Sequence, residues 1–248
     1  MKAINEQMNP STGYTRQVGF LTIVSGLLAL LCLVLSGIAL ADHPDAFADP
    51  VQVLSIPNVS SSLLRWSMLA DLMGYYLLLL PVIFWLHQWL KAQTPWAPLI
   101  TFCATSYVLI GAIGAIILAV LTPTFLAEYT AASADGKATV QLIYKAVVEI
   151  VYGALWNTLE VLLAGAWLLF TGFFLTQFGR TFRWATLLLG MFSILDGLGE
   201  VLGLKTIAEV GLNGYLILAP IWAIWLGVVL WLSSRHSVSM THRTELAI

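Results

Sequence analysis

Charged residues are scarce in this sequence. Asp, Glu, Lys and Arg make up only 10% of it, whereas about a quarter of an ordinary soluble domain is charged. Apolar residues fill the deficit and account for 59% of the chain. We therefore expect an integral membrane protein whose main partner is the lipid bilayer, because lipid can accept the apolar surface that water cannot. The net charge of −2 offers no basic surface to nucleic acid.

Cysteine is equally rare, and the two present, Cys32 and Cys103, both lie inside apolar runs. We interpret them as small hydrophobic residues rather than as a disulfide or a pair of metal ligands. The sequence also lacks the phosphate-binding, dinucleotide-binding, zinc-protease and serine-hydrolase motifs. It therefore nominates no catalytic residue, no metal site and no cofactor, and an enzyme is the less favoured class.

Long apolar runs, by contrast, are abundant. A hydrocarbon core about 30 Å thick requires roughly 20 helical residues to cross it. Six stretches reach that length, and they predict one all-α, polytopic membrane domain over residues 1–248, built as a six-helix transmembrane bundle. The predicted spans are 18–41, 66–90, 98–122, 147–175, 182–205 and 212–233. In the polar connections 42–65 and 123–146 we expect at most a short surface helix and no independent core.

The distribution of Lys and Arg predicts the orientation of these spans, because cytoplasmic connections are enriched in both residues. If the N-terminus is cytoplasmic, seven basic residues lie inside, namely Lys2, Arg16, Lys91, Arg180, Arg183, Arg235 and Arg243. The four outside are then Arg65, Lys137, Lys145 and Lys205. We therefore expect both termini in the cytoplasm (N-in/C-in), with the protein in a bacterial-type cytoplasmic (inner) membrane.

Carboxylates inside the predicted spans are the candidates for function, because a charge near a helix centre costs about 2.5–3.5 kcal/mol on insertion scales. There are five of them: Asp71, Glu149, Glu160, Asp196 and Glu200. At a rise of about 1.5 Å per residue, all five lie between the membrane midplane and the outer interface. Gly197, Gly199 and Gly203 surround the last two acids and would let a neighbouring helix approach closely. We therefore expect an outward-open polar pocket among the second, fourth and fifth spans.

Helical spacing adds two hydrogen-bonding partners to these acids. Asn157 precedes Glu160 by about one turn, and Tyr75 follows Asp71 by one turn, so each shares a helix face with its acid. The candidate ligand- or ion-binding residues are therefore Asp71, Glu160, Asp196, Glu200, Asn157 and Tyr75.

Two interpretations of these residues remain open. In the first, clustered carboxylates in a low dielectric hold a proton or bind a cation, as in a small coupled transporter or a ligand-binding membrane protein. In the second, the acids form ion pairs with basic residues at the outer ends of the same spans: Arg65, Lys145 and Lys205. The protein would then be a structural or accessory subunit, with a membrane-protein partner or a second copy of itself.

Two stretches also follow the pattern of a known family. "LLRWSMLADLMGYYLLLLPVIFWLHQWLK" (63–91) resembles the second helix of the DUF4386 family of bacterial membrane proteins, in which an arginine precedes a helix with an early aspartate. "LEVLLAGAWLLFTGFFLTQFGRTFRWATLLLGMFSILDGLGEV" (159–201) looks like that family's fourth helix, a short basic turn and a helix with a late aspartate. The resemblance covers about residues 15–233. The family has no assigned activity, so the resemblance supports the topology and marks four residues without naming a substrate: Arg65, Asp71, Glu160 and Asp196. Glu200 is not part of the pattern.

Overall fold

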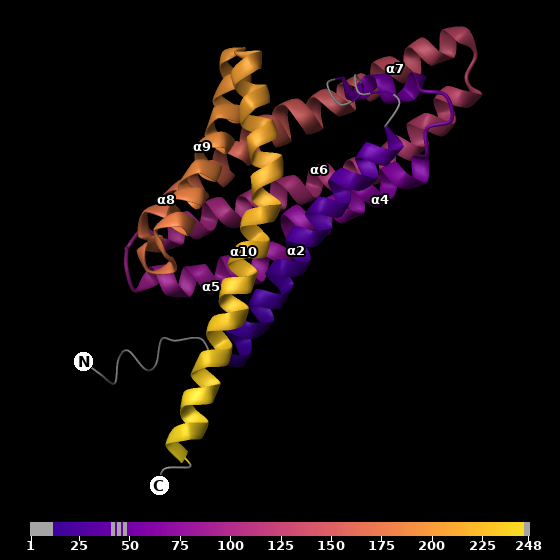
Figure 1. The fold of residues 1–248 in the computed structure, drawn as a ribbon. Coiled ribbons are helices and arrows are strands. Elements are labelled where there is room, and N and C mark those ends of the chain that lie inside the picture. Colours follow the sequence, from indigo (N-terminus) through magenta and orange to yellow (C-terminus); the bar gives the residue numbers. More distant parts are fainter. Residues whose placement is uncertain (1–11, 41–42, 44–45, 47–48, 246–248) are drawn as a thin grey trace.

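The computed structural model describes residues 12–40, 43, 46 and 49–245, with side chains as far as Ser233. Three of the basic residues that predict the orientation are affected by these limits: Lys2 lies outside the described residues, and Arg235 and Arg243 are described as backbone alone. All regular structure in the described ranges is helical, and no strand occurs there (Figure 1).

Within these ranges, six helices are long and apolar enough to cross a membrane, as the sequence predicted. The first is α2 (Thr12–Ala39), the second combines α4 (Ser61–Asp71), η2 (Leu72–Tyr76), η3 (Leu77–Leu79) and α5 (Leu80–Lys91), and the third is α6 (Ala97–Ala131). The fourth combines α7 (Ala134–Val148), η4 (Glu149–Glu160), α8 (Val161–Phe174) and η5 (Leu175–Phe178); α9 (Arg180–Leu202) and α10 (Lys205–Glu245) complete the set. The predicted all-α, six-helix fold of an integral membrane protein is therefore confirmed.

The surface of the helices has the apolar character that a bilayer requires. On α2, for example, the large exposed residues are Phe20, Leu27, Leu31, Val34 and Ile38. Their spacing of three, four and seven residues places them on one face of the helix. A soluble protein would bury such a face, whereas a membrane helix presents it to lipid.

The first and last spans pack side by side, as Figure 1 shows for α2 and α10. Glycines make this approach possible: a Cβ atom added at Gly227 would lie 2.6 Å from the Gly19 carbonyl oxygen, and one at Gly26 would lie 2.6 Å from the Pro220 carbonyl oxygen. Close to the start of α2 and far along α10, the Arg16 guanidinium lies 4.8 Å from the centre of the Trp231 ring. The beginning of the first span and the later part of the last span therefore lie on the same side of the bundle.

At the end of the fifth span a glycine has a different role, because it terminates the helix. Gly203 has a φ of +68°, and the N–H groups of Gly203 and Leu204 donate to the carbonyls of Glu200 and Gly199 at 3.1 and 2.8 Å. A left-handed residue directly after a helix is a common terminator, and glycine adopts it without steric cost. Gly197 and Gly199, as expected, are positions of close packing, against Leu162 and Ala208 respectively.

The two long connections differ from the expected polar loops. The third helix continues through Pro123 to Ala131, and α7 begins at Ala134, so most of 123–146 is helical. Ser133 caps α7 by accepting a hydrogen bond from the Gly136 N–H at 3.3 Å. A serine at this position supplies the partner that the first turn of a helix lacks.

These connections also bury a hydrophobic cluster, which corrects the expectation that they carry no core. We call this the cap cluster. Its buried members come from the connection between α2 and η1 (Pro50–Ser55), from η1 itself and from α4, α6 and α7: Leu40, Ala46, Val51, Val53, Leu54, Leu64, Leu126, Tyr144 and Val148. Figure 1 shows the segment around η1 beside α7. The apolar residues within each connection are too few to form a core alone, but together they form one.

Candidate functional site

Two segments inside the membrane spans are π-helical rather than α-helical. In a π-helix the backbone N–H bonds the carbonyl five residues earlier; such turns are rare and are frequent at functional sites. The segment η2 begins directly after Asp71, and η4 ends at Glu160. Each π segment therefore adjoins one of the predicted acids, and the α-helical spacing assumed from the sequence does not apply beside them.

Glu160 takes its hydrogen bond from a tyrosine of the second span rather than from Asn157, its predicted partner. The Tyr76 hydroxyl donates to both carboxyl oxygens of Glu160, at 3.2 Å to Oε1 and 3.1 Å to Oε2. Both residues are buried, with 5% and 3% of their surface exposed. Gly111 on α6 makes room for the Tyr76 ring, since a Cβ atom at that position would collide with it. The sequence analysis missed Tyr76.

Tyr75 instead has a backbone role, so its predicted bond to an acid was wrong. Its hydroxyl donates to the carbonyl oxygen of Leu216 at 2.8 Å. Pro220, four residues after Leu216, has no N–H with which to bond that carbonyl. The Tyr75 hydroxyl therefore supplies the hydrogen bond that the proline removes.

Carbonyls of the π turn η2 likewise accept hydrogen bonds from side-chain hydroxyls. The Tyr107 hydroxyl donates to the Tyr75 carbonyl at 2.6 Å and accepts from the Tyr215 hydroxyl at 3.0 Å. The Ser25 hydroxyl donates to the Gly74 carbonyl. Backbone groups at membrane depth must be satisfied within the protein, and here side-chain hydroxyls from two other spans, the first and the third, do so.

Three of the predicted acids, Asp71, Glu160 and Asp196, are buried in the interior of the bundle. Ser193 on α9 donates to the Val161 carbonyl at 2.7 Å, which holds the two helices together next to Glu160 and one turn before Asp196. Glu160 interacts electrostatically with both Asp71 and Asp196. These three carboxyls come from the second, fourth and fifth spans, the spans that the sequence analysis named.

The three carboxyls differ in their hydrogen bonds. Asp196 has 0% of its surface exposed, and neither of its oxygens has a hydrogen-bond partner. Asp71 has 7% exposed; its Oδ1 accepts from the Cys32 thiol at 4.0 Å, and its Oδ2 has no partner. Glu160 alone has a strong donor, Tyr76. The group is buried, and so differs from the expected pocket open to the outside.

The other predicted residues on the fourth and fifth spans do not belong to this buried group. Glu200, four residues after Asp196, is exposed, although it still interacts electrostatically with Asp196. Asn157 is half-buried, and within the described part of the chain its side chain makes no hydrogen bond to a carboxyl. Glu149 is exposed on η4. The structure thus separates the six candidate residues into three buried carboxyls and three residues with different surroundings, namely Tyr75, Asn157 and Glu200.

The predicted ion pairs do not form in this structure. Arg65, Lys145 and Lys205 all have exposed side chains. Among the described residues none of them pairs with a buried carboxyl, since Glu160 bonds Tyr76 and the Asp196 oxygens have no partner. Residues 12–40, 43, 46 and 49–233 also contain no group of three His, Cys, Asp or Glu arranged to hold a metal ion.

No protein-family model matches this chain, and no curated protein and no solved structure matches it either. The resemblance to the DUF4386 family accordingly stays a prediction.

Proposed function

We propose that this integral membrane protein is a proton-coupled carrier, in which the buried carboxyls of Asp71, Glu160 and Asp196 bind and release the coupling proton. The observation that carries this proposal is Asp196, which is wholly buried and has no hydrogen-bond partner on either oxygen. A buried carboxylate without a partner costs several kcal/mol, whereas the protonated acid is uncharged and avoids most of that cost. Asp196 is therefore expected to hold a proton in the state described here.

Glu160 has the opposite environment. One hydroxyl, that of Tyr76, donates to both of its oxygens, and a hydrogen bond to an ionised acceptor is about twice as strong as a neutral one. Within one electrostatically connected group, Glu160 is thus the best placed to carry negative charge, and Asp71 and Asp196 are the better proton holders. Such a difference gives neighbouring carboxyls different affinities for a proton.

The alternative, a structural subunit with acids that staple helices, has less support. It depends on ion pairs to Arg65, Lys145 or Lys205, and these three side chains are exposed. We place the carrier in a bacterial-type cytoplasmic membrane because the distribution of basic residues fits that orientation.

Infrared spectroscopy of the full chain in lipid nanodiscs tests the proposal, because a protonated carboxyl has a carbonyl absorption that a carboxylate lacks. Wild type is expected to show this absorption at neutral pH and to lose it on alkaline titration. Asp196→Asn should remove a large part of the signal. The matched control is Glu149→Gln, which changes an exposed acid and should leave the signal unchanged. If wild type shows no protonated carboxyl at neutral pH, or if Asp196→Asn leaves its absorption intact, the proposal fails.

A further inference from the structure

A cavity lies at the centre of the bundle and is lined by every one of the six spans described above. About 20 Å³ of its interior can be reached by the centre of a water molecule. Its walls come from α2, η2, η3, α6, α8, α9 and α10: Gly26, Ala29, Gly74, Tyr75, Leu79, Tyr107, Trp167, Leu168, Leu189, Tyr215, Ala219, Pro220, Trp222 and Ala223. None of the three buried carboxyls lines it, so it is a site distinct from the proton-binding group.

Irregular backbone surrounds this cavity on two sides. The π turn η2 and the 3₁₀ turn η3 interrupt the second span, and Pro220 interrupts the hydrogen bonding of the last. At membrane depth such irregularity is tolerated where the backbone is buried in protein or lines a cavity, and in carriers it commonly marks the solute site. Both interruptions contribute to the wall here, through Tyr75 and Leu79 on one side and Pro220 on the other.

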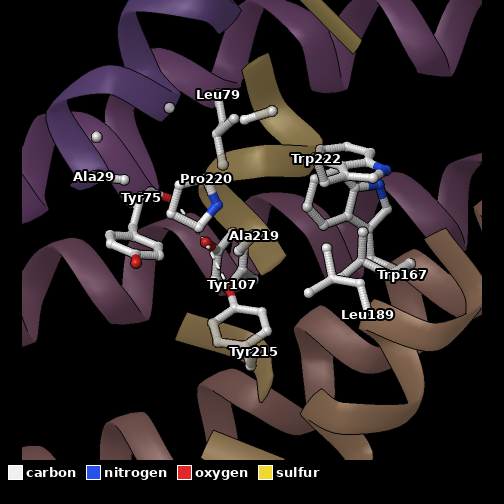
Figure 2. Close-up of a pocket in the computed structure, with 14 residues that line it drawn as sticks. Ala29, Tyr75, Leu79, Tyr107, Trp167, Leu189, Tyr215, Ala219, Pro220 and Trp222 are labelled. Atoms are coloured by element: carbon white, nitrogen blue, oxygen red, sulfur yellow. Dashed lines mark hydrogen bonds between the residues drawn. The ribbon is translucent and has the colours of Figure 1, made fainter. Parts of the chain in front are cut away.

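The chemistry of the wall indicates what the cavity would accept. The residues that line it include no Asp, Glu, Lys, Arg or His, so an ion would lack a partner there. Figure 2 shows Trp167, Trp222 and Leu189 together on one side of the cavity and Tyr75 on the other. The Tyr215 hydroxyl donates to Tyr107 and keeps its own oxygen available as an acceptor. An apolar wall with a few hydroxyls suits an uncharged molecule with an apolar body and one hydrogen-bond donor.

One residue connects the cavity with the carboxyls. Tyr107 lines the cavity, and the centre of its ring lies 5.6 Å from that of Tyr76, which donates to Glu160. A molecule that displaces Tyr107 would therefore press on the ring whose hydroxyl holds Glu160. This contact gives the cavity a short physical route to the charge of the site.

We infer that this cavity is the solute site of the protein and takes a small uncharged molecule with an aromatic or aliphatic body and one hydroxyl or amine. The inference rests on the proposed carrier function in calling this molecule the solute. The binding itself can be measured separately from any proton step.

The test uses 4-fluorophenol as the probe and fluorine NMR of the full chain in lipid nanodiscs, with empty nanodiscs as the measure of lipid partitioning. Wild type is expected to give a saturable bound signal. Ala219→Leu fills the cavity and should weaken binding by about tenfold or more. The matched control is Ala154→Leu, the same change on an exposed position of η4, which should bind as wild type does. Each variant is first shown to be monodisperse.

A second variant tests the assigned hydroxyl. Tyr215→Phe should weaken 4-fluorophenol roughly threefold to tenfold, the effect of one lost hydrogen bond, and leave 4-fluorotoluene unchanged. The inference is overturned if wild type shows no saturable signal, if Ala219→Leu and Ala154→Leu bind alike, or if Tyr215→Phe affects both probes equally. Binding of the probe by Asp196→Asn separates the two proposals. If the carboxyls fail the infrared test and the probe still binds, the cavity site stands and only the proton function is removed.

Discussion

At the scale of single residues, two adjacent tyrosines have different roles because a π turn lies between Asp71 and the rest of the second span. Tyr75 directs its hydroxyl to a carbonyl of α10, and Tyr76 directs its hydroxyl to Glu160. In an α-helix Tyr75, four residues after Asp71, would lie on the same face as Asp71. In the wider π turn Tyr76, five residues after Asp71, lies on that face instead. The two residues are chemically identical, so their roles are assigned by the direction in which the backbone points each side chain and by the partner helix that each one meets.

Removing these hydroxyls one at a time should separate the two roles. Tyr75→Phe leaves the Leu216 carbonyl without a partner and should lower the free energy of unfolding by about 1–3 kcal/mol, because the carbonyl stays buried. Tyr76→Phe should destabilise to a similar extent, and should also change the carboxyl infrared absorption, since Glu160 loses its donor. Thermal unfolding and infrared spectra of both variants check this. Identical spectra for the two variants would contradict the assignment of Tyr76.

At the scale of helices, small residues decide which spans can touch. Gly19 and Gly227 face each other between α2 and α10, and Gly211 on α10 packs against the backbone of α9 at Asp196. Lipid is as apolar as leucine, so helices in a membrane gain little from burying apolar side chains against each other, and close backbone packing becomes the main attraction. The position of Asp196 therefore depends on a glycine in the following helix.

Gly227→Ala should destabilise the bundle by about 1–3 kcal/mol, because the added methyl group meets the backbone of Gly19 and neither helix backbone can move cheaply. Gly37→Ala is the matched control: nothing lies within 4 Å of a Cβ atom there, and alanine should stabilise α2 by up to about 1 kcal/mol. The free energy of unfolding of both variants can be measured in mixed micelles as the fraction of denaturing detergent is increased. Equal effects of the two substitutions would show that the α2–α10 contact is not the close one described.

At the scale of the whole molecule, the cap cluster and the carboxyls lie in the same region of the bundle. Tyr152 packs against the cap cluster and interacts electrostatically with Asp71. The cap cluster thus lies close to Asp71, one of the three buried carboxyls. With the N-terminus in the cytoplasm, this region is the outer one.

Cysteine labelling tests that orientation. Ser133, in the turn between α6 and α7, and Thr181, near the turn between η5 and α9, are both exposed and belong to opposite sides of the bundle in the predicted topology. A membrane-impermeant maleimide added to intact bacterial cells should label Ser133→Cys. It should label Thr181→Cys only after the membrane is opened. The native thiols give little background, as Cys32 is buried and Cys103 half-buried. The reverse pattern would refute the N-in/C-in orientation.

The sequence by itself determined the number of spans and the acids worth inspecting. Span length and apolar composition are local properties, so they can be read without knowing which helices touch. The same holds for Asp71, Glu160 and Asp196, which are conspicuous because charge is costly in lipid. Glu200 is equally conspicuous by that measure, yet it is exposed. It lies two residues before the end of α9, and that end is set by Gly203, which stops the helix.

Only the tertiary structure decided how these residues are connected. The bond from Tyr75 to Leu216 joins positions 141 residues apart, and that between Tyr76 and Glu160 joins positions 84 apart. No periodicity within one span predicts either, because each depends on a partner helix and on a π turn that changes the phase of the side chains. The π turn can persist because other spans satisfy its free carbonyls, so packing among the spans, rather than local composition, fixed the site.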